Sequence, residues 1–191
     1  MISGFKKAHQ TEILEIDLPS KEQVRRGFEA LKTARDKAIY LFYATTGLRR
    51  TEVLELNRFE DIDYKLRAVK SKRDTRTKKA GITFYNAECE YWLKRYLDSR
   101  KDDLEKLFKI GWGEPFQRLW KEISKKVGVK ITPQILRKWH ATMLGELGVP
   151  DRYVDIFQGR APKSVLAKFY TGKELKRLKR IYDKANLRIL T

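Results

Sequence analysis

The sequence has 191 residues, of which 41% are hydrophobic, and this length and composition suit one compact domain with a buried core. It has no apolar run near the roughly 18 to 20 residues of a membrane span, no signal-peptide segment and one cysteine, Cys89. We therefore expect a cytoplasmic protein without membrane attachment, internal disulfides or a cysteine-rich zinc site. The net charge is +18, and the excess of Lys and Arg is spread along the chain rather than held in one tail. This charge favours a polyanionic partner, and a generally cationic surface without such a partner is the alternative.

The first third of the chain predicts an extended lead-in, residues 1–19, followed by three helices. Ser20 and Gln23 form a capping-box pattern at the start of the first helix. A second helix ends at Gly47, and its buried stripe consists of Ala34, Ala38, Leu41, Phe42 and Thr45. Arg49 then lies on the turn that enters a short helix ending at Leu56.

The middle third predicts a β-hairpin and two helices. Residues 66–72 and 80–85 have strand patterns, and the charged segment between them is too polar to be buried. The acidic run at residues 60–63 has no partner cluster for a metal, and we interpret it as a turn that enters the sheet. Asn86 is expected to cap a long helix, and a further amphipathic helix carries Phe116, Leu119, Trp120 and Ile123.

The last third predicts helices throughout. Thr132 supplies a capping hydroxyl and Pro133 the first helical position of a helix that runs to Gly145 or Gly148. Further helices are expected from Pro150 to near Gly159, from Pro162 to Gly172, and over residues 173–190. The fold class is therefore mainly α with a small antiparallel β-sheet, an α+β domain.

Three segments together resemble the catalytic domain of the tyrosine recombinases, the phage-integrase type. Residues 46–56, TGLRRTEVLEL, are similar to the first arginine box of that family, and residues 132–142, TPQILRKWHAT, to the second, usually T-P-H-x-L-R-H-T-x-A-T. Residues 158–160, QGR, stand where the family has L-G-H or L-G-W. Tyr170 follows at close to the family's spacing. The resemblance spans roughly residues 20–172.

The resemblance implies that Tyr170 is the nucleophile and that Arg49 and Arg137 hold the phosphate. Gln134 and Arg160 replace a histidine and a histidine or tryptophan, and both can still donate hydrogen bonds to a phosphate, although neither acts as a base near neutral pH. Archaeal viral and plasmid integrases tolerate such substitutions, and we favour that branch. His140 stands where the family has an apolar residue, and we interpret it as a partly buried structural histidine.

The family also uses a lysine on the β-hairpin as general acid, and Lys72 is the best match, with Lys70, Lys78 and Lys79 as alternatives. Other basic residues near these motifs are expected to contact DNA. They are Arg50, Lys70, Arg73, Arg76, Lys78 and Lys138.

These residue types suit attack on a phosphodiester. Negative charge grows on the nonbridging oxygens as the phosphorus becomes five-coordinate, and planar guanidinium groups can donate bidentate hydrogen bonds to these oxygens. Glu52 is placed to orient Arg49 from one turn away. A phosphotyrosyl link keeps the energy of the phosphodiester, so rejoining needs no cofactor and no metal.

The resemblance implies double-stranded DNA as partner and a tetramer on DNA, with residues 173–191 packed on their own domain or exchanged between protomers. Family members generally carry an N-terminal helical domain, and residues 1–19 are too short to be one, so we expect weaker site selectivity. Two other functions remain open, a type IB topoisomerase-like activity and non-catalytic DNA binding.

Overall fold

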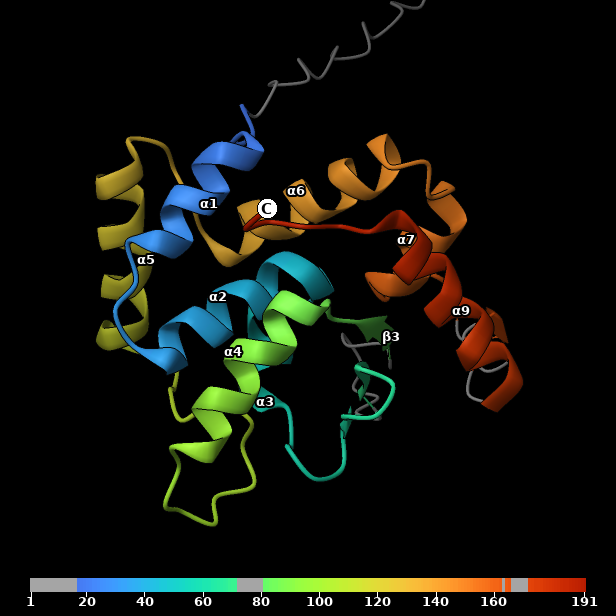
Figure 1. The fold of residues 1–191 in the computed structure, drawn as a ribbon, viewed down its shortest axis with the longest axis horizontal. Helices are drawn as coiled ribbons and strands as arrows, with labels where there is room; N and C mark the ends of the chain where they lie inside the picture. The colour runs from blue at the N-terminus through green and yellow to red at the C-terminus, as the bar shows by residue number, and fades with distance from the viewer. Residues whose placement is uncertain (1–16, 72–80, 163, 166–171) are drawn as a thin grey trace, which may run out of the picture.

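The computed structural model describes residues 17–71, 81–162, 164–165 and 172–191. It is mainly helical with one small antiparallel sheet, as the sequence predicted (Figure 1). No helix in the described part of the chain is long and apolar enough to span a bilayer. The helices are α1 Lys21–Glu29, α2 Ala34–Thr46, α3 Arg50–Glu55, α4 Ala87–Asp98, α5 Glu114–Val127, α6 Pro133–Glu146, α7 Asp151–Phe157 and α9 Gly172–Ala185.

Helix α2 is the centre of the core. All of its residues from Ala38 to Thr46 are buried, whereas the sequence predicted a buried stripe on one face only. The reason is that α4 and α6 pack against it from different sides, so it has no broad solvent face (Figure 1). Cys89 on α4 is buried in this core.

The predicted capping residues begin and end the helices. Ser20 and Gln23 form the capping box of α1, and the Thr132 hydroxyl accepts from the backbone N–H of Ile135 at the start of α6. Gly47 ends α2 with φ +63°, a conformation that glycine adopts without steric cost. These local signals were sufficient to place the ends of three helices.

The sheet has three antiparallel strands in the order β1-β2-β3: β1 Ile62–Asp63, β2 Ala68–Ser71 and β3 Gly81–Phe84. Residues 60–63 enter the sheet, as expected, but Ile62 and Asp63 also form a strand that was not predicted, pairing with Val69 and Ala68. The register of β2 with β3 places Ser71 opposite Gly81. The predicted strands were longer, but Lys72 and Ala80 lie outside the described residues.

The end of the chain differs from its prediction. Most of the helix expected from Pro162 to Gly172 lies outside the described residues. Helix α9, described from Gly172, stops at Ala185 and not near Leu190, because Asn186 takes a left-handed conformation with φ +49°. Residues 186–191 then run back over the domain, with Leu187 and Ile189 buried. The Glu88 carboxylate accepts from the backbone N–H groups of Ile189 and Leu190 at 2.8 and 2.9 Å. A helix through Leu190 would have lost these bonds.

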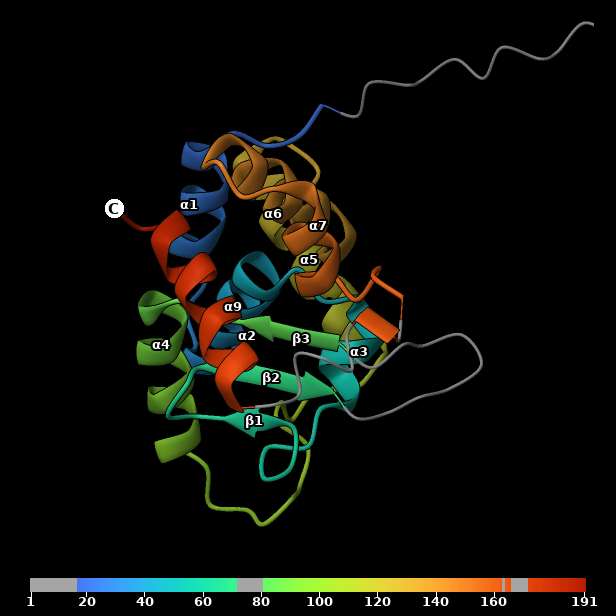
Figure 2. The ribbon, with the colours of Figure 1, turned by 90° about the vertical axis from the view of Figure 1, so that its right-hand side faces the viewer.

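Helix α9 packs across the sheet of its own chain (Figure 2). Tyr182 contacts the rings of Phe84 and Phe157, and its hydroxyl donates to the carbonyl of Thr45 at 2.8 Å. The buried residues of the helix are Leu175, Leu178, Lys179, Tyr182 and Ala185. Because only Thr171 separates Tyr170 from α9 in the sequence, this packing fixes where the described chain resumes after Tyr170.

Candidate active site

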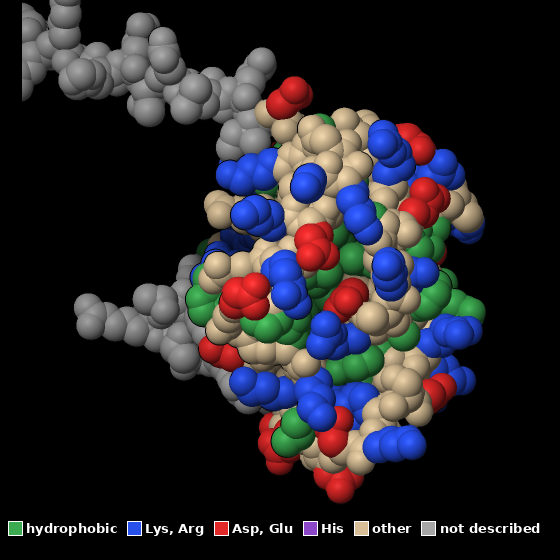
Figure 3. Space-filling model, turned by 90° about the vertical axis from the view of Figure 1, so that its left-hand side faces the viewer, with side chains coloured by type: hydrophobic (Ala, Val, Ile, Leu, Met, Phe, Trp, Pro, Cys, Tyr) green, Lys and Arg blue, Asp and Glu red, His purple; other side chains and the backbone are tan. Residues whose placement is uncertain are grey.

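A cleft of about 930 Å³ lies between α3, α6 and the segment after α7. Six of its lining side chains are Lys or Arg, and none of the described residues that line it is Asp or Glu. The face drawn in Figure 3, in contrast, mixes acidic and basic side chains. The cleft is therefore a local concentration of positive charge. Its lining residues are Leu18, Arg49, Arg50, Thr51, Lys130, Thr132, Pro133, Gln134, Arg137, Lys138, Ala141, Thr142, Gln158 and Arg160.

Arg49 is presented to the cleft by the turn between α2 and α3. The Glu52 carboxylate, one helical turn on, accepts from the Arg49 backbone N–H at 2.6 Å and from its guanidinium Nη1 at 2.8 Å. The Arg49 side chain is 43% exposed, so its remaining donors can meet a ligand. Glu52 orients Arg49 as the sequence predicted.

Arg137 is the most buried of the cleft arginines, with a side chain 13% exposed. Its guanidinium donates to the carbonyls of Gly47 at 2.6 Å and Gln158 at 2.7 Å, and Glu52 lies 3.9 Å away. Burial, and then the neighbouring charge of Arg49, lower the pKa of Arg137 to about 10. The group therefore stays protonated at neutral pH, with its direction fixed by two carbonyls.

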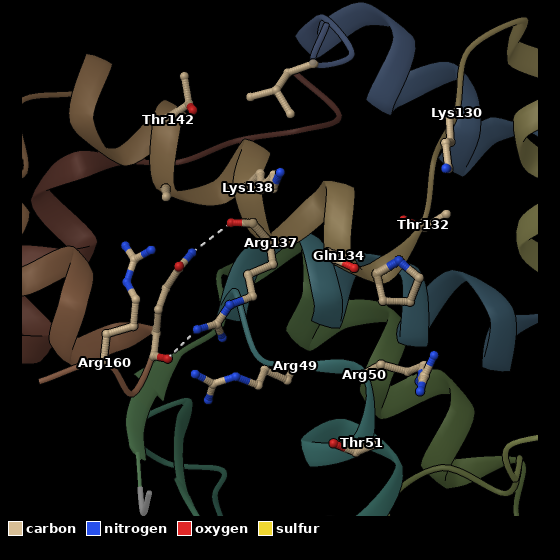
Figure 4. Close-up of a pocket in the computed structure, with 14 residues that line it drawn as sticks. Arg49, Arg50, Thr51, Lys130, Thr132, Gln134, Arg137, Lys138, Thr142 and Arg160 are labelled. Carbon is tan, nitrogen blue, oxygen red and sulfur yellow. Dashed lines mark hydrogen bonds between the residues drawn. The ribbon is translucent and has the colours of Figure 1, made fainter. Parts of the chain in front are cut away.

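Arg160 reaches the same cleft from the end of α7. Its guanidinium Nε pairs with Asp155 at 2.8 Å, and the side chain is 47% exposed. Figure 4 shows the guanidinium groups of Arg49, Arg137 and Arg160 gathered at one end of the cleft, although they come from three segments of the chain. The structure therefore brings together the three arginines that the sequence singled out.

The other predicted site residues divide into two groups. Gln134, Lys138 and Arg50 line the cleft. Lys70 does not, and its ammonium group on β2 pairs with the carboxylate of Asp63 at 3.2 Å.

Several predicted residues lie outside the described part of the chain. They are Tyr170, Lys72, Arg73, Arg76, Lys78 and Lys79. Of the described residues that flank them, Gly81, which starts β3, lies against Gly159, because a Cβ on Gly81 would come 3.7 Å from the Gly159 Cα. Gly159 directly precedes Arg160. The hairpin strands therefore end beside the arginine cluster.

The acidic run at residues 60–63 is used in local structure. The Asp61 carboxylate accepts from the backbone N–H of Asn57 at 2.8 Å, and Asp63 accepts from the backbone N–H of Leu66 at 3.0 Å. Among the described residues, no group of three or more His, Cys, Asp or Glu side chains could hold a metal ion. The structure gives these two carboxylates the role of stabilising the turns around β1.

Sequence reasoning missed the buried contacts behind the arginines. The Gln158 side chain, 1% exposed, donates from Nε2 to the carbonyl of Arg137 at 2.7 Å and lies 3.2 Å from His140 Nδ1. His140 is fully buried rather than partly buried, and burial, followed by the charge of Arg137, lowers its pKa to about 3. The polar residues at 140 and 158, where the related family has apolar ones, were the signal that could have indicated this pair.

Residues 20–177 match the phage integrase family. The chain is 29% identical over 143 residues to tyrosine recombinase XerA of Saccharolobus solfataricus and 30% identical over 182 residues to that of Pyrococcus furiosus. These matches cover 75% and 88% of this chain and 47% and 61% of the relatives. The chain thus spans about half to three fifths of the relatives' length.

Solved structures share the fold. A crystal structure of XerA recombinase superimposes with a TM-score of 0.69 at 24% identity, over 95% of this chain and 68% of the other. The integrase from mycobacterium phage Brujita gives a TM-score of 0.62 at 19% identity, over 90% and 60% of the two chains. The arrangement of helices around the arginine cluster is therefore found in other proteins.

Proposed function

Because the chain belongs to the phage integrase family, we propose that it is the catalytic domain of a site-specific DNA recombinase that cuts and rejoins DNA through a 3′-phosphotyrosyl intermediate. The observation that carries the proposal is the convergence of Arg49, Arg137 and Arg160 in a cleft whose charged lining residues, among those described, are all Lys or Arg. A backbone phosphate is the ligand that such a cluster of forked donors fits.

In the proposed reaction the phenolic oxygen of Tyr170 attacks a backbone phosphorus. The new O–P bond forms as the bond to the 5′ oxygen breaks, the phenolic proton is released, and Lys72 protonates the departing 5′ oxygen. Arg49, Arg137 and Arg160 stabilise the charge on the nonbridging oxygens, and Gln134 adds a neutral hydrogen-bond donor. Attack by the 5′-hydroxyl of another strand reverses these steps and joins it.

Arg137 is suited to this role because it is charged and fixed before DNA arrives. Its two bonds to backbone carbonyls leave little reorganisation for the reaction. The proposal includes double-stranded DNA as substrate and a tetramer as the working unit on DNA. The relatives named tyrosine recombinase and the solved complex of XerH recombinase with its difH substrate support it by analogy.

The test is covalent capture on a duplex with a nick or a bridging phosphorothiolate, which prevents rejoining. The proposal expects protein attached to the 3′ phosphate, capture that survives EDTA, and loss of capture in Tyr170→Phe. Tyr91→Phe is the matched control, since Tyr91 is 54% exposed on α4 and does not line the cleft. Capture by Tyr170→Phe at the wild-type level would refute the proposal. In a separate assay on supercoiled circles, relaxation without joining between duplexes would favour the topoisomerase-like activity.

A further inference from the structure

The ring of Trp112 is 55% exposed, in the segment that precedes α5, and the guanidinium of Arg50 lies over it at 3.5 Å from the ring centroid. Burial of a large aromatic ring is normally favourable, so a ring that stays exposed is a candidate for a binding or positioning role. Arg50 lines the cationic cleft, so Trp112 forms a support at its rim. No role for Trp112 was predicted from the sequence.

Both members of this stack are anchored to the core. The ring of Trp112 packs on buried Phe116 at 5.8 Å, and Phe116 contacts Tyr43 at 6.3 Å. The Tyr43 hydroxyl donates to the backbone carbonyl of Arg50 at 2.9 Å. These contacts close a ring from Arg50 through Trp112, Phe116 and Tyr43 back to Arg50. Arg50 is therefore held in place at both its backbone carbonyl and its guanidinium.

The charge of Arg50 differs from that of its neighbours in the cleft. Within the described part of the chain, Arg49 pairs with Glu52 and Arg160 with Asp155, whereas Arg50 pairs with no carboxylate. Stacking uses the face of a guanidinium and leaves its N–H edge directed outward, in the geometry that a phosphate accepts. Arg50 therefore presents, in a fixed orientation, a charge that no carboxylate among the described residues pairs with.

The position of Arg50 separates it from the arginine cluster. In Figure 4 its guanidinium lies at the opposite end of the cleft from Arg160 and points away from Arg49. Lys130 lines the cleft on the side of Arg50. A phosphate bound by Arg49 and Arg137 would not reach it, so its ligand is a different phosphate of the same DNA.

We propose that Trp112 is a positioning residue that holds Arg50 as the contact for a DNA backbone phosphate separate from the one that is attacked. The inference rests on the proposed DNA-cutting function. The ligand class is a phosphodiester and carries no base specificity, because a guanidinium on a phosphate reads no base edge. The contact depends on Arg50 and Trp112, two residues of this chain that stack on each other.

The test measures the affinity of the full chain for an uncleaved duplex at several salt concentrations, with every variant made in Tyr170→Phe to separate binding from cutting. Arg50→Met should lower the slope of log affinity against log salt by about 0.9, the loss of one phosphate contact. Trp112→Ala should weaken binding by about two- to fivefold, the range of an exposed cation–π contact. The double variant should bind like Arg50→Met alone, because Trp112 acts only through Arg50.

Trp92→Phe is the matched control. Trp92 also has a cation over its ring, Lys37 at 4.3 Å, but neither residue lines the cleft, so affinity and salt slope should not change. Trp112→Phe keeps a ring on Phe116 and should retain most of the affinity, which separates loss of stacking from loss of folding. Additive effects of the two substitutions, or an unchanged slope in Arg50→Met, would overturn the inference. If the wild-type chain is captured on DNA but Arg50→Met leaves the salt slope unchanged, this inference alone is contradicted. If the wild-type chain is not captured, the proposed function is contradicted.

Discussion

Arg137 and Gln158 are bonded to each other in both directions. The Arg137 guanidinium donates to the Gln158 carbonyl at 2.7 Å, and the Gln158 side-chain amide donates to the Arg137 carbonyl at 2.7 Å. This reciprocal pair joins α6 to the end of α7, two residues before Arg160. The distance between Arg137 and Arg160, two of the residues proposed to bind the phosphate, therefore depends on the buried amide of Gln158.

Gln158→Leu should destabilise the protein and slow cutting. The substitution keeps the approximate volume but leaves the polar groups of Arg137 and His140 without their buried partner, a cost of about 1 to 3 kcal/mol. Urea unfolding followed by circular dichroism measures the stability, and single-turnover cleavage measures the rate. An unfolding midpoint equal to that of wild type would show that the amide contributes nothing.

Gly47→Ala should be far more damaging than Gly128→Ala. Both glycines end a helix with positive φ, +63° and +82°, so both substitutions carry backbone strain of about 1 to 2 kcal/mol. Only at Gly47 would the new Cβ collide with other groups, 2.8 Å from His140 Cε1 and 3.0 Å from Gln158 Nε2, whereas nothing lies within 4 Å at Gly128. Thermal melting compares the two directly, and equal losses of stability would contradict the packing described behind Arg137.

Glu52→Gln should lower the rate of cutting by about ten- to hundredfold, the equivalent of one charge-assisted hydrogen bond. The Glu52 side chain, 8% exposed, bonds to Arg49 and lies 3.9 Å from Arg137. It therefore orients the Arg49 guanidinium and partly neutralises the positive charge of both arginines. Glu60→Gln, at an exposed position outside the cleft, is the control. Cutting at the wild-type rate in Glu52→Gln would mean that orientation of Arg49 does not limit the reaction.

The free energy of unfolding should depend on pH through the titration of His140. Its folded-state pKa of about 3 lies below the ordinary 6.5, so the unfolded chain binds more protons between these values and stability falls as pH drops below about 6.5. The slope from this group is at most about 1.4 kcal/mol per pH unit. Urea unfolding at pH 5 and pH 7 measures it.

His140→Phe is the matching variant for that slope. It removes the titrating group, and unfolding should then depend less on pH between 5 and 7. The rate of cutting in wild type should show no inflection from His140 in this range, because the imidazole stays neutral throughout. A pH dependence of unfolding that is the same in both proteins would contradict the burial of a neutral imidazole.

The sequence predicted what local patterns determine. Ser20, Gly47 and Thr132 mark helix ends through bonds within a few residues, and the order of the arginine boxes predicted which guanidinium groups would meet. The contacts that it missed join distant segments. The Gln158 amide bonds to a residue 21 positions away, and Glu88 bonds to backbone groups about 100 positions away. Such contacts leave no periodic signal in either partner.

Short elements were missed for a related reason. Strand β1 has two residues, too few for an alternating pattern, and it exists only because Val69 and Ala68 pair with it. Residues 186–190 continue an amphipathic pattern, but their backbone bonds to side chains at the start of α4 instead: Glu88 accepts from the N–H groups of Ile189 and Leu190, and Asn86 donates to the Leu187 carbonyl. In both places a tertiary hydrogen bond decides a conformation that local propensity leaves open.

Mass spectrometry of the captured complex tests the central claim most directly. After trypsin and nuclease digestion, the proposal predicts a nucleotide adduct on the peptide of residues 169–173, FYTGK, which contains Tyr170 as its sole tyrosine. Fragmentation should place the phosphate on that tyrosine. An adduct on any other peptide, with residues 169–173 recovered unmodified, would contradict the assignment of Tyr170 as the nucleophile.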